Sequence, residues 1–217
     1  MSEPDPAWAS IATGMWAVLG LLSLRTWTGY EIAQQAPRSI NRAWPQRDSS
    51  LYAHPPKLVD HGLASVTTEK HGGRTRKRYA ITDRGREALS WWLAQPTSDP
   101  EMFIEPFVRM MFADQGSPES TIRTIEGFST WAAENCEAML TQLEGQLGGG
   151  EPFPHRSRQN SVTALGHAMM YSAILEWTQR ARELHMADPT LAHVDANEIR
   201  REAISLHRAA LEGFGRS

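Results

Sequence analysis

The stretch from Leu63 to Thr82 limits the possible folds most, because its apolar residues show a rough alternation that differs from the helical spacing elsewhere. Val66 lies in its first half and Tyr79 in its second, and Gly72-Gly73 stands between the two halves. Alternation on both sides of a two-glycine turn is typical of a β-hairpin. The rest of this 217-residue chain follows helical spacing. We therefore expect a mainly α protein with one small β element.

Helical patterns surround this hairpin in a definite order. Segments 16–24, 28–37 and 48–62 precede it and segment 82–93 follows it. Thr28 and Glu31 have the spacing of a capping box, and Thr82 is a good N-cap for the last segment. Three helices, a hairpin and a further helix form the order of a winged helix-turn-helix domain with a two-stranded wing.

The third of these helical segments contains two adjacent prolines, Pro55 and Pro56. A proline inside a helix removes one hydrogen bond and clashes with the preceding turn, at a cost of roughly 3 kcal/mol. We therefore expect the helix to break there, with Pro56 starting a second turn that runs to His61. The recognition element would then be short, and the wing would contribute a larger share of the binding affinity.

The C-terminal half has no strand pattern. After a linker at 96–100, apolar stripes with helical spacing run over 103–111, 122–147, 162–184 and 199–214, and the glycine- and proline-rich segment 148–154 interrupts them. Helices with one apolar stripe need partners, so these stripes should pack on each other, on the N-terminal domain or on a second copy. We predict two domains: residues 1–95, a winged helix-turn-helix domain, and residues 96–217, a helical dimerisation domain that could also bind an effector.

Charge is strongly polarised along the chain. The net charge is -3, but residues 37–86 contain 11 Lys or Arg and four Asp or Glu, giving that segment +7 and leaving -10 for the remainder. A basic segment joined to an acidic body indicates a polyanion-binding module fused to a domain with another role.

The candidate DNA-binding residues follow from this fold. The second helix of a helix-turn-helix enters the major groove, and its early side chains reach base edges while neighbouring groups bind phosphates. Cations of the wing would contact the backbone or enter the minor groove. The ring of Tyr52 could equally belong to the core, with only its hydroxyl at a phosphate. The candidates are Arg47, Ser49, Ser50, Tyr52, His54 and Lys57 in the helix, and Arg74, Arg76 and Lys77 in the wing.

The sequence argues against several other classes. One cysteine, Cys136, cannot form an internal disulfide, and the eight histidines lack ligand spacing, so we expect no metal and no cofactor. There is no nucleophile elbow and no phosphate-binding glycine loop, so we do not expect an enzyme. The longest apolar run, Met15–Leu22, is too short to span a bilayer and no basic stretch precedes it, which predicts a cytoplasmic protein without membrane contact.

Tryptophan is abundant, with eight residues. Trp91 and Trp92 at the domain junction, and Trp131 and Trp177 on C-terminal helices, are candidates for a ligand pocket. Aromatic residues at helical spacing are more often core or dimer interface, and both interpretations stay open here.

Four blocks of this sequence together resemble the PadR family of transcriptional regulators. They keep the order and spacing of that family over about residues 15 to 95, whereas the C-terminal half resembles its longer members only in helical character and in residues 107–114. Where the family usually has a leucine three positions after the tyrosine, this chain has Pro55. The blocks are Val18–Leu24, Thr28–Ile32, Ser50–Tyr52 with Lys57-Leu58 and Gly62-Leu63, and Arg78–Leu89.

The resemblance implies a homodimer joined through the C-terminal helices that binds a near-palindromic operator in double-stranded DNA and usually represses transcription. It also implies that a small aromatic or drug-like molecule could release the DNA. Our leading hypothesis is such a DNA-binding regulator. The alternative is a ligand- or protein-sensing adaptor with a degenerate winged helix, an interpretation that Pro55 and Pro56 would favour.

Overall fold

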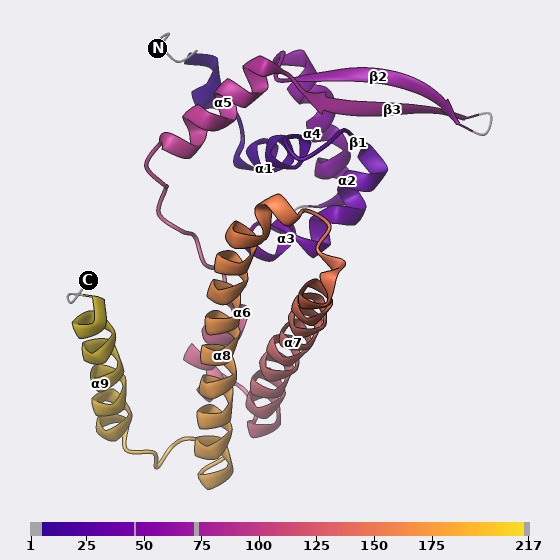
Figure 1. Ribbon diagram of the computed structural model, residues 1–217. Coiled ribbons are helices and arrows are strands. Elements are labelled where there is room, and N and C mark those ends of the chain that lie inside the picture. The colour runs from indigo at the N-terminus through magenta and orange to yellow at the C-terminus, as the bar shows by residue number, and fades with distance from the viewer. Residues whose placement is uncertain (1–5, 46, 72–73, 215–217) are drawn as a thin grey trace. The chain divides into compact units, whose positions relative to one another are not determined.

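The computed structural model describes residues 6–45, 47–71 and 74–214 (Figure 1). Contacts divide these residues into two units, the first ending at Pro100 and the second beginning at Glu101. Each unit has its own core. Among the described residues, no helix combines the length and the apolar character needed to cross a membrane.

The first unit contains the predicted order of three helices, hairpin and helix, with short additions. A 3-10 turn, Pro6–Ser10, comes first, and another, Ala36–Arg38, leads into a one-turn helix, α3. The remaining elements are α1 (Thr13–Leu22), β1 (Trp27–Thr28), α2 (Gly29–Gln35), α3 (Ile40–Ala43), α4 (Asp48–Asp60), β2 (Ala64–His71), β3 (Arg74–Ile81) and α5 (Asp83–Ala94).

The hairpin of β2 and β3, here called the wing, is confirmed, and it is extended by a strand that the sequence did not predict. β1 pairs antiparallel with β3, so the sheet order is β1-β3-β2, with Trp27 opposite Tyr79 and Thr28 opposite Arg78. Trp27 and Tyr79 are both buried. The third strand thus ties the base of the wing to the start of α2. The turn at Gly72-Gly73 lies outside the described residues.

The predicted helix caps are present. The Thr28 hydroxyl accepts the amide of Glu31 at 3.2 Å, and Glu31 Oε2 accepts the amide of Thr28 at 2.7 Å, which completes the capping box. Thr82 Oγ1 accepts the amide of Gly85 at 3.0 Å at the start of α5. These short-range signals fix where α2 and α5 begin.

The predicted break at Pro55 is wrong: α4 continues unbroken from Asp48 to Asp60. The φ that a proline ring fixes is itself helical, so the cost lies in the lost hydrogen bonds and the local clash. Burial offsets this cost, because Leu51, Pro55 and Leu58 form one face that is fully buried. The helix ends as predicted, with Gly62 at a φ of 70°.

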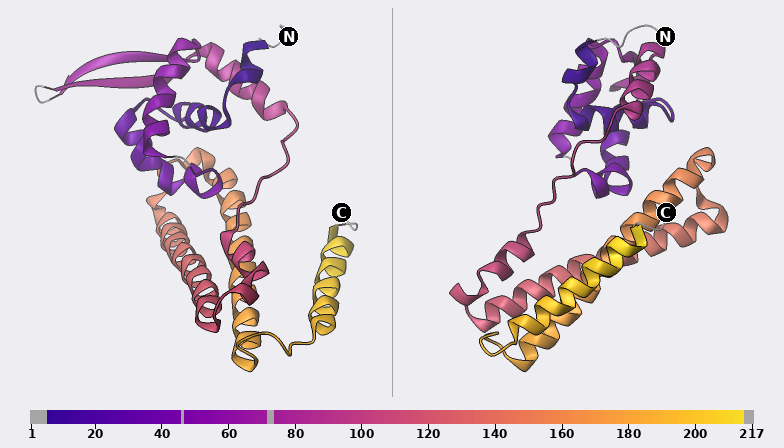
Figure 2. Two further views of the ribbon diagram at one scale, coloured as in Figure 1. Left: turned by 180° about the vertical axis from the view of Figure 1, so that it is seen from behind. Right: turned by 90° about the vertical axis from the view of Figure 1, so that its left-hand side faces the viewer.

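The second unit is helical throughout its regular elements. Figure 2 shows its two long helices, α7 and α8, side by side. Buried residues along their shared face include Ile125, Phe128, Met139 and Tyr171. The elements are α6 (Glu105–Met111), a 3-10 turn (Ala113–Gln115), α7 (Pro118–Gly145), a π turn (Gln146–Gly150), a 3-10 turn (Pro154–Arg156), α8 (Ser157–Ala187) and α9 (Ala196–Phe214).

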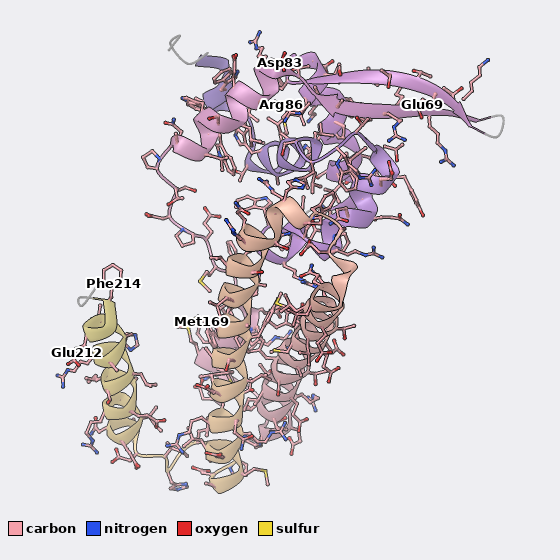
Figure 3. The ribbon with its side chains drawn as sticks, viewed as in Figure 1. Glu69, Asp83, Arg86, Met169, Glu212 and Phe214 are labelled. Carbon is pink, nitrogen blue, oxygen red and sulfur yellow. The ribbon has the colours of Figure 1, made fainter. Side chains whose placement is uncertain are left out.

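Two apolar stripes of this unit remain uncovered in the described chain. On α8 the stripe is covered near Ala181 but exposed at Val162, Leu165 and Met169, which are 73%, 62% and 67% exposed. No residue of α9 is buried, and Phe214 at its end is 81% exposed. Figure 3 marks Met169 on α8 and Phe214 on α9. A bidentate ion pair, Arg180 with Glu202, links α9 to α8.

Candidate nucleic-acid interface

The start of α4 carries polar side chains that differ in exposure. Arg47 is the N-cap residue with an extended backbone and is exposed, as is Ser49 in the first turn, while Ser50 is half-buried. In α4, Leu51, Pro55 and Leu58 are buried, Ser50, His54 and Val59 are half-buried, and the remaining positions are exposed. A guanidinium and hydroxyl groups at the open start of a helix can reach base edges and phosphates.

Tyr52 lies at the border between this face and the core. A Cβ atom on Gly29 would be 3.2 Å from Tyr52 Cδ1, so the ring lies against the first turn of α2. The side chain is nevertheless 48% exposed. Both interpretations of Tyr52 fit this position, with the ring packed and the rest accessible.

His54 and Lys57 differ in their surroundings. Lys57 is exposed, whereas His54 is half-buried and lies toward the buried side of α4. Burial, and next the positive charge of Lys57, lower the pKa of His54 below its ordinary 6.5. His54 is therefore neutral at pH 7 and offers no positive charge to a phosphate.

The wing presents cations on both of its faces. Glu69 lies opposite Arg76 and Thr68 lies opposite Lys77, and both cations are exposed. Because side chains alternate along a strand, Arg76 and Lys77 point to opposite faces. The side chain of Arg74 lies outside the described residues, and its backbone pairs with His71. A hairpin with cations on both faces can contact phosphates on two sides at once.

A comparison with protein families gives one match for this unit. The model described as the Transcriptional regulator PadR-like family matches residues 18–90, which run from the middle of α1 into α5. Residues 18–90 of this chain are therefore similar to that family. The resemblance seen in the sequence is thereby confirmed over these residues.

Similarity to individual proteins extends this result. The PadR-like chain is 30% identical over 94 residues to the Negative transcriptional regulator PadR of Bacillus subtilis, an overlap of 43% of this chain and 52% of that protein. The chain spans about half the length of the curated relatives that it matches.

Two crystal structures of Bacillus subtilis PadR share the fold. The structure in complex with operator DNA has a TM-score of 0.66 at 20% identity, covering 77% of this chain and 97% of that one. The structure in complex with p-coumaric acid has a TM-score of 0.61 at 21% identity, covering 86% and 99%. The likeness therefore includes long C-terminal helices as well as the winged helix.

The four candidate pocket tryptophans of this PadR-like chain belong to two different aromatic clusters. Trp91 and Trp92 pack with Trp16 in the first unit, at ring-centroid distances of 6.3 and 5.6 Å. Trp131 and Trp177 belong to the second unit. Each pair thus has ring partners within its own unit.

The cluster of the second unit joins three helices. Phe107 of α6 lies 4.8 Å from Trp177 of α8, and Phe128 of α7 lies 5.7 Å from Trp131. Tyr171 approaches Trp131 at 5.5 Å and donates a 3.4 Å hydrogen bond to Asn135. Trp131 is 45% exposed, so this aromatic cluster reaches the surface of the unit.

Two further cations of the first unit were missed as site residues. Arg78 lies on β3 two positions after Arg76, on the same face, and strand alternation could have identified it. Arg25 precedes β1, outside the basic segment, and its position beside Arg78 depends on a strand that the sequence did not reveal.

Proposed function

We propose that this PadR-like chain is a sequence-specific DNA-binding transcriptional regulator that acts as a dimeric repressor and leaves its operator when a small aromatic or drug-like molecule binds. The observation that carries the proposal is the joint exposure of the start of α4, at Arg47 and Ser49, and of the wing cations Arg76 and Lys77. Both elements are held on one small domain with a buried core.

In this proposal α4 and the wing make different kinds of contact with DNA. Arg47 and Ser50 at the start of α4 would read base edges in the major groove, where an arginine can bond guanine O6 and N7 together. Arg74, Arg76 and Lys77 on the wing would contact phosphates, which position the protein but carry no sequence information. Contacts of the second kind depend steeply on salt, because each one releases counterions from the DNA.

A second copy of the chain is the proposed occupant of the uncovered stripes of the second unit. Val162, Leu165 and Met169 on α8 and Leu206 on α9 expose apolar surface of a kind that monomers rarely keep in contiguous patches. A dimer would also match the two-fold symmetry of a near-palindromic operator. Sedimentation velocity should give a dimer for the native chain, and Leu206→Lys should shift it toward monomer.

Repression and effector release are proposed from relatives. Bacillus subtilis PadR is named a negative transcriptional regulator and has been crystallised with p-coumaric acid. In this chain the aromatic cluster around Trp131 offers ring faces that suit a planar ligand. The adaptor alternative was favoured by a broken recognition helix, and the unbroken α4 removes that reason.

The test is a fluorescence-anisotropy titration of the purified chain against the DNA upstream of its own gene, at several salt concentrations and beside a scrambled duplex. We expect tight binding that prefers the native sequence and weakens steeply with salt. Arg47→Ala and Ser50→Ala should change the sequence preference. Charge reversal of Arg74 and Arg76 should weaken binding to all duplexes and lower the salt slope.

Arg86→Glu, on α5, is the matched control for the single reversal Arg76→Glu, which is measured beside the double reversal, because both single changes alter the charge of the same unit equally. It should leave the salt slope nearly unchanged. Unaltered affinity in both the α4 and the wing variants would refute the site assignment. Weak binding without preference for either duplex would refute the proposed function for this DNA, and addition of p-coumaric acid to a bound complex would test release.

A further inference from the structure

Two guanidinium groups meet at one backbone oxygen at the base of the wing. Arg25 Nη1 donates to the carbonyl oxygen of Thr26 at 3.3 Å, and Arg78 Nη2 donates to the same oxygen at 3.4 Å. The two arginines are distant in sequence, one preceding β1 and the other on β3. The pairing of β1 with β3 brings them together. In Figure 1, β1 lies at the base of the wing beside α2.

Arg25 is held in place by two neighbours. Its guanidinium carbon lies 3.6 Å from the centroid of the Trp27 ring, and Nη1 lies 3.0 Å from Glu31 Oε1. Burial alone would raise the pKa of Glu31, but the Thr28 amide and then Arg25 outweigh it and lower that pKa, so Glu31 is ionised at neutral pH. The capping box of α2 therefore also orients Arg25.

Arg78 is held more loosely by an acid. Its Nε lies 3.7 Å from Oε1 of Glu69, whose side chain is 57% exposed. An ion pair with this long a distance and this much solvent exposure contributes little stability, so another anion can displace Glu69. Figure 3 marks Glu69 on the wing.

Both arginine side chains are partly exposed to solvent. The side chain of Arg25 is 43% exposed and that of Arg78 is 30% exposed. A guanidinium carries five N–H donors in a planar fork, and the contacts described above use only some of them. Two like charges that share one carbonyl also repel each other, and a bound anion between them would remove that repulsion.

The position of this pair suits the backbone of DNA. β1 connects the wing, through the pairing of Thr28 with Arg78, to α2, whose first residue Gly29 lies against Tyr52 of α4. The pair thus lies between the two elements proposed to bind DNA. We propose that Arg25 and Arg78 form a clamp for one backbone phosphate, and that Glu69 occupies Arg78 until the phosphate replaces it. This inference rests on the proposed function, since it assigns a further contact to the same interface.

The test compares Arg25→Gln, Arg78→Gln, their double variant and Glu69→Gln by anisotropy on the native and scrambled duplexes across salt concentrations. Each arginine variant should weaken binding to both duplexes by about tenfold. Because the two side chains share one phosphate, the double variant should bind DNA only slightly more weakly than the single variant that has the lower affinity. The slope of log K against log salt should become shallower by about 0.9, the value for one phosphate contact.

Glu69→Gln separates the clamp from a structural role. If Glu69 competes with phosphate, its removal should tighten binding to both duplexes by severalfold. If the ion pair serves only to hold the sheet, Glu69→Gln should lower thermal stability and leave the affinity of the folded protein unchanged or reduced. Arg86→Gln on α5 is the control, with the same loss of charge in the same unit and an unchanged slope expected.

The outcomes distinguish this inference from the proposed function. If the native chain binds no duplex, the proposed function is refuted. Native chain that binds DNA, with Arg78→Gln folded by circular dichroism and indistinguishable from Arg86→Gln in affinity and slope, would refute the clamp alone. If Arg25→Gln does not fold because Trp27 loses its cation, Arg78→Gln and Glu69→Gln still decide the question.

Discussion

Replacing Gly85 by alanine should destabilise the first unit, although the same change favours most helices. A Cβ atom at Gly85 would lie 2.1 Å from the carbonyl oxygen of Leu63 and 2.8 Å from Cγ1 of Ile81. That oxygen also accepts the amide of Thr82 at 3.1 Å. The added methyl group must therefore push the start of α5 away from the start of the wing.

The change in the free energy of unfolding caused by Gly85→Ala is the sum of two opposing contributions. Overpacking a well-packed site costs about 1–3 kcal/mol, and the upper value applies because the first atom met is backbone that cannot rotate away. Alanine regains up to about 1 kcal/mol of helix propensity. The expected net loss is about 2 kcal/mol in the free energy of unfolding. Gly20→Ala in α1 is the control, because no atom lies within 4 Å of its Cβ position and it should gain about 0.5–1 kcal/mol.

Urea unfolding followed by circular dichroism measures both variants. With an m-value of about 2 kcal/mol per molar urea, Gly85→Ala should lower the midpoint by about 1 M, and Gly20→Ala should raise it. If Gly85→Ala equals or exceeds the native chain in stability while Gly20→Ala behaves as expected, the close approach of α5 to the wing does not exist as described.

Three further predictions concern single groups. Thr28→Ala removes the capping box of α2 and should cost about 1 kcal/mol, seen as a Tm lower by roughly 5 °C. The amide of His193 and other donors lower the pKa of Asp188 to about 2, so its stabilising effect is complete above pH 4 and disappears as the pH falls through 2. The Tm deficit of Asp188→Asn should accordingly vanish between pH 4 and pH 2. In an NMR titration His54 should titrate below 6.5, and Lys57→Ala should raise that midpoint only in part, because burial is the larger cause.

Local signals explain why so much of the first unit could be predicted. The Thr28 capping box, the Thr82 cap and the Gly62 stop each depend on a few neighbouring residues, and all three are present. Alternation about two glycines similarly identified the wing. Such features are decided within one or two turns of chain, so distant residues cannot change them easily.

Features that depend on tertiary contacts could not be predicted. Trp27-Thr28 forms a strand only because β3 supplies its hydrogen-bonding partner, about fifty residues later. Pro55 remains in a helix because its ring is buried between Leu51 and Leu58, and burial on this scale offsets the lost hydrogen bonds. The helical stripes of the second unit were recognised, but their spacing could not tell that α9 would have no buried residue within the chain.

The candidate site shows the same division between local and distant effects. A sequence shows how many cations a segment has, and strand alternation shows which of them share a face, so Arg76 and Arg78 could be grouped and Lys77 set apart. It does not show that Arg25, outside the basic segment, donates to the same carbonyl as Arg78. Affinity for a phosphate depends on such convergence, because two guanidiniums on one anion act together whereas dispersed cations act singly. The net charge of +7 in residues 37–86 therefore predicts attraction to DNA, and the fold decides where a phosphate can be held.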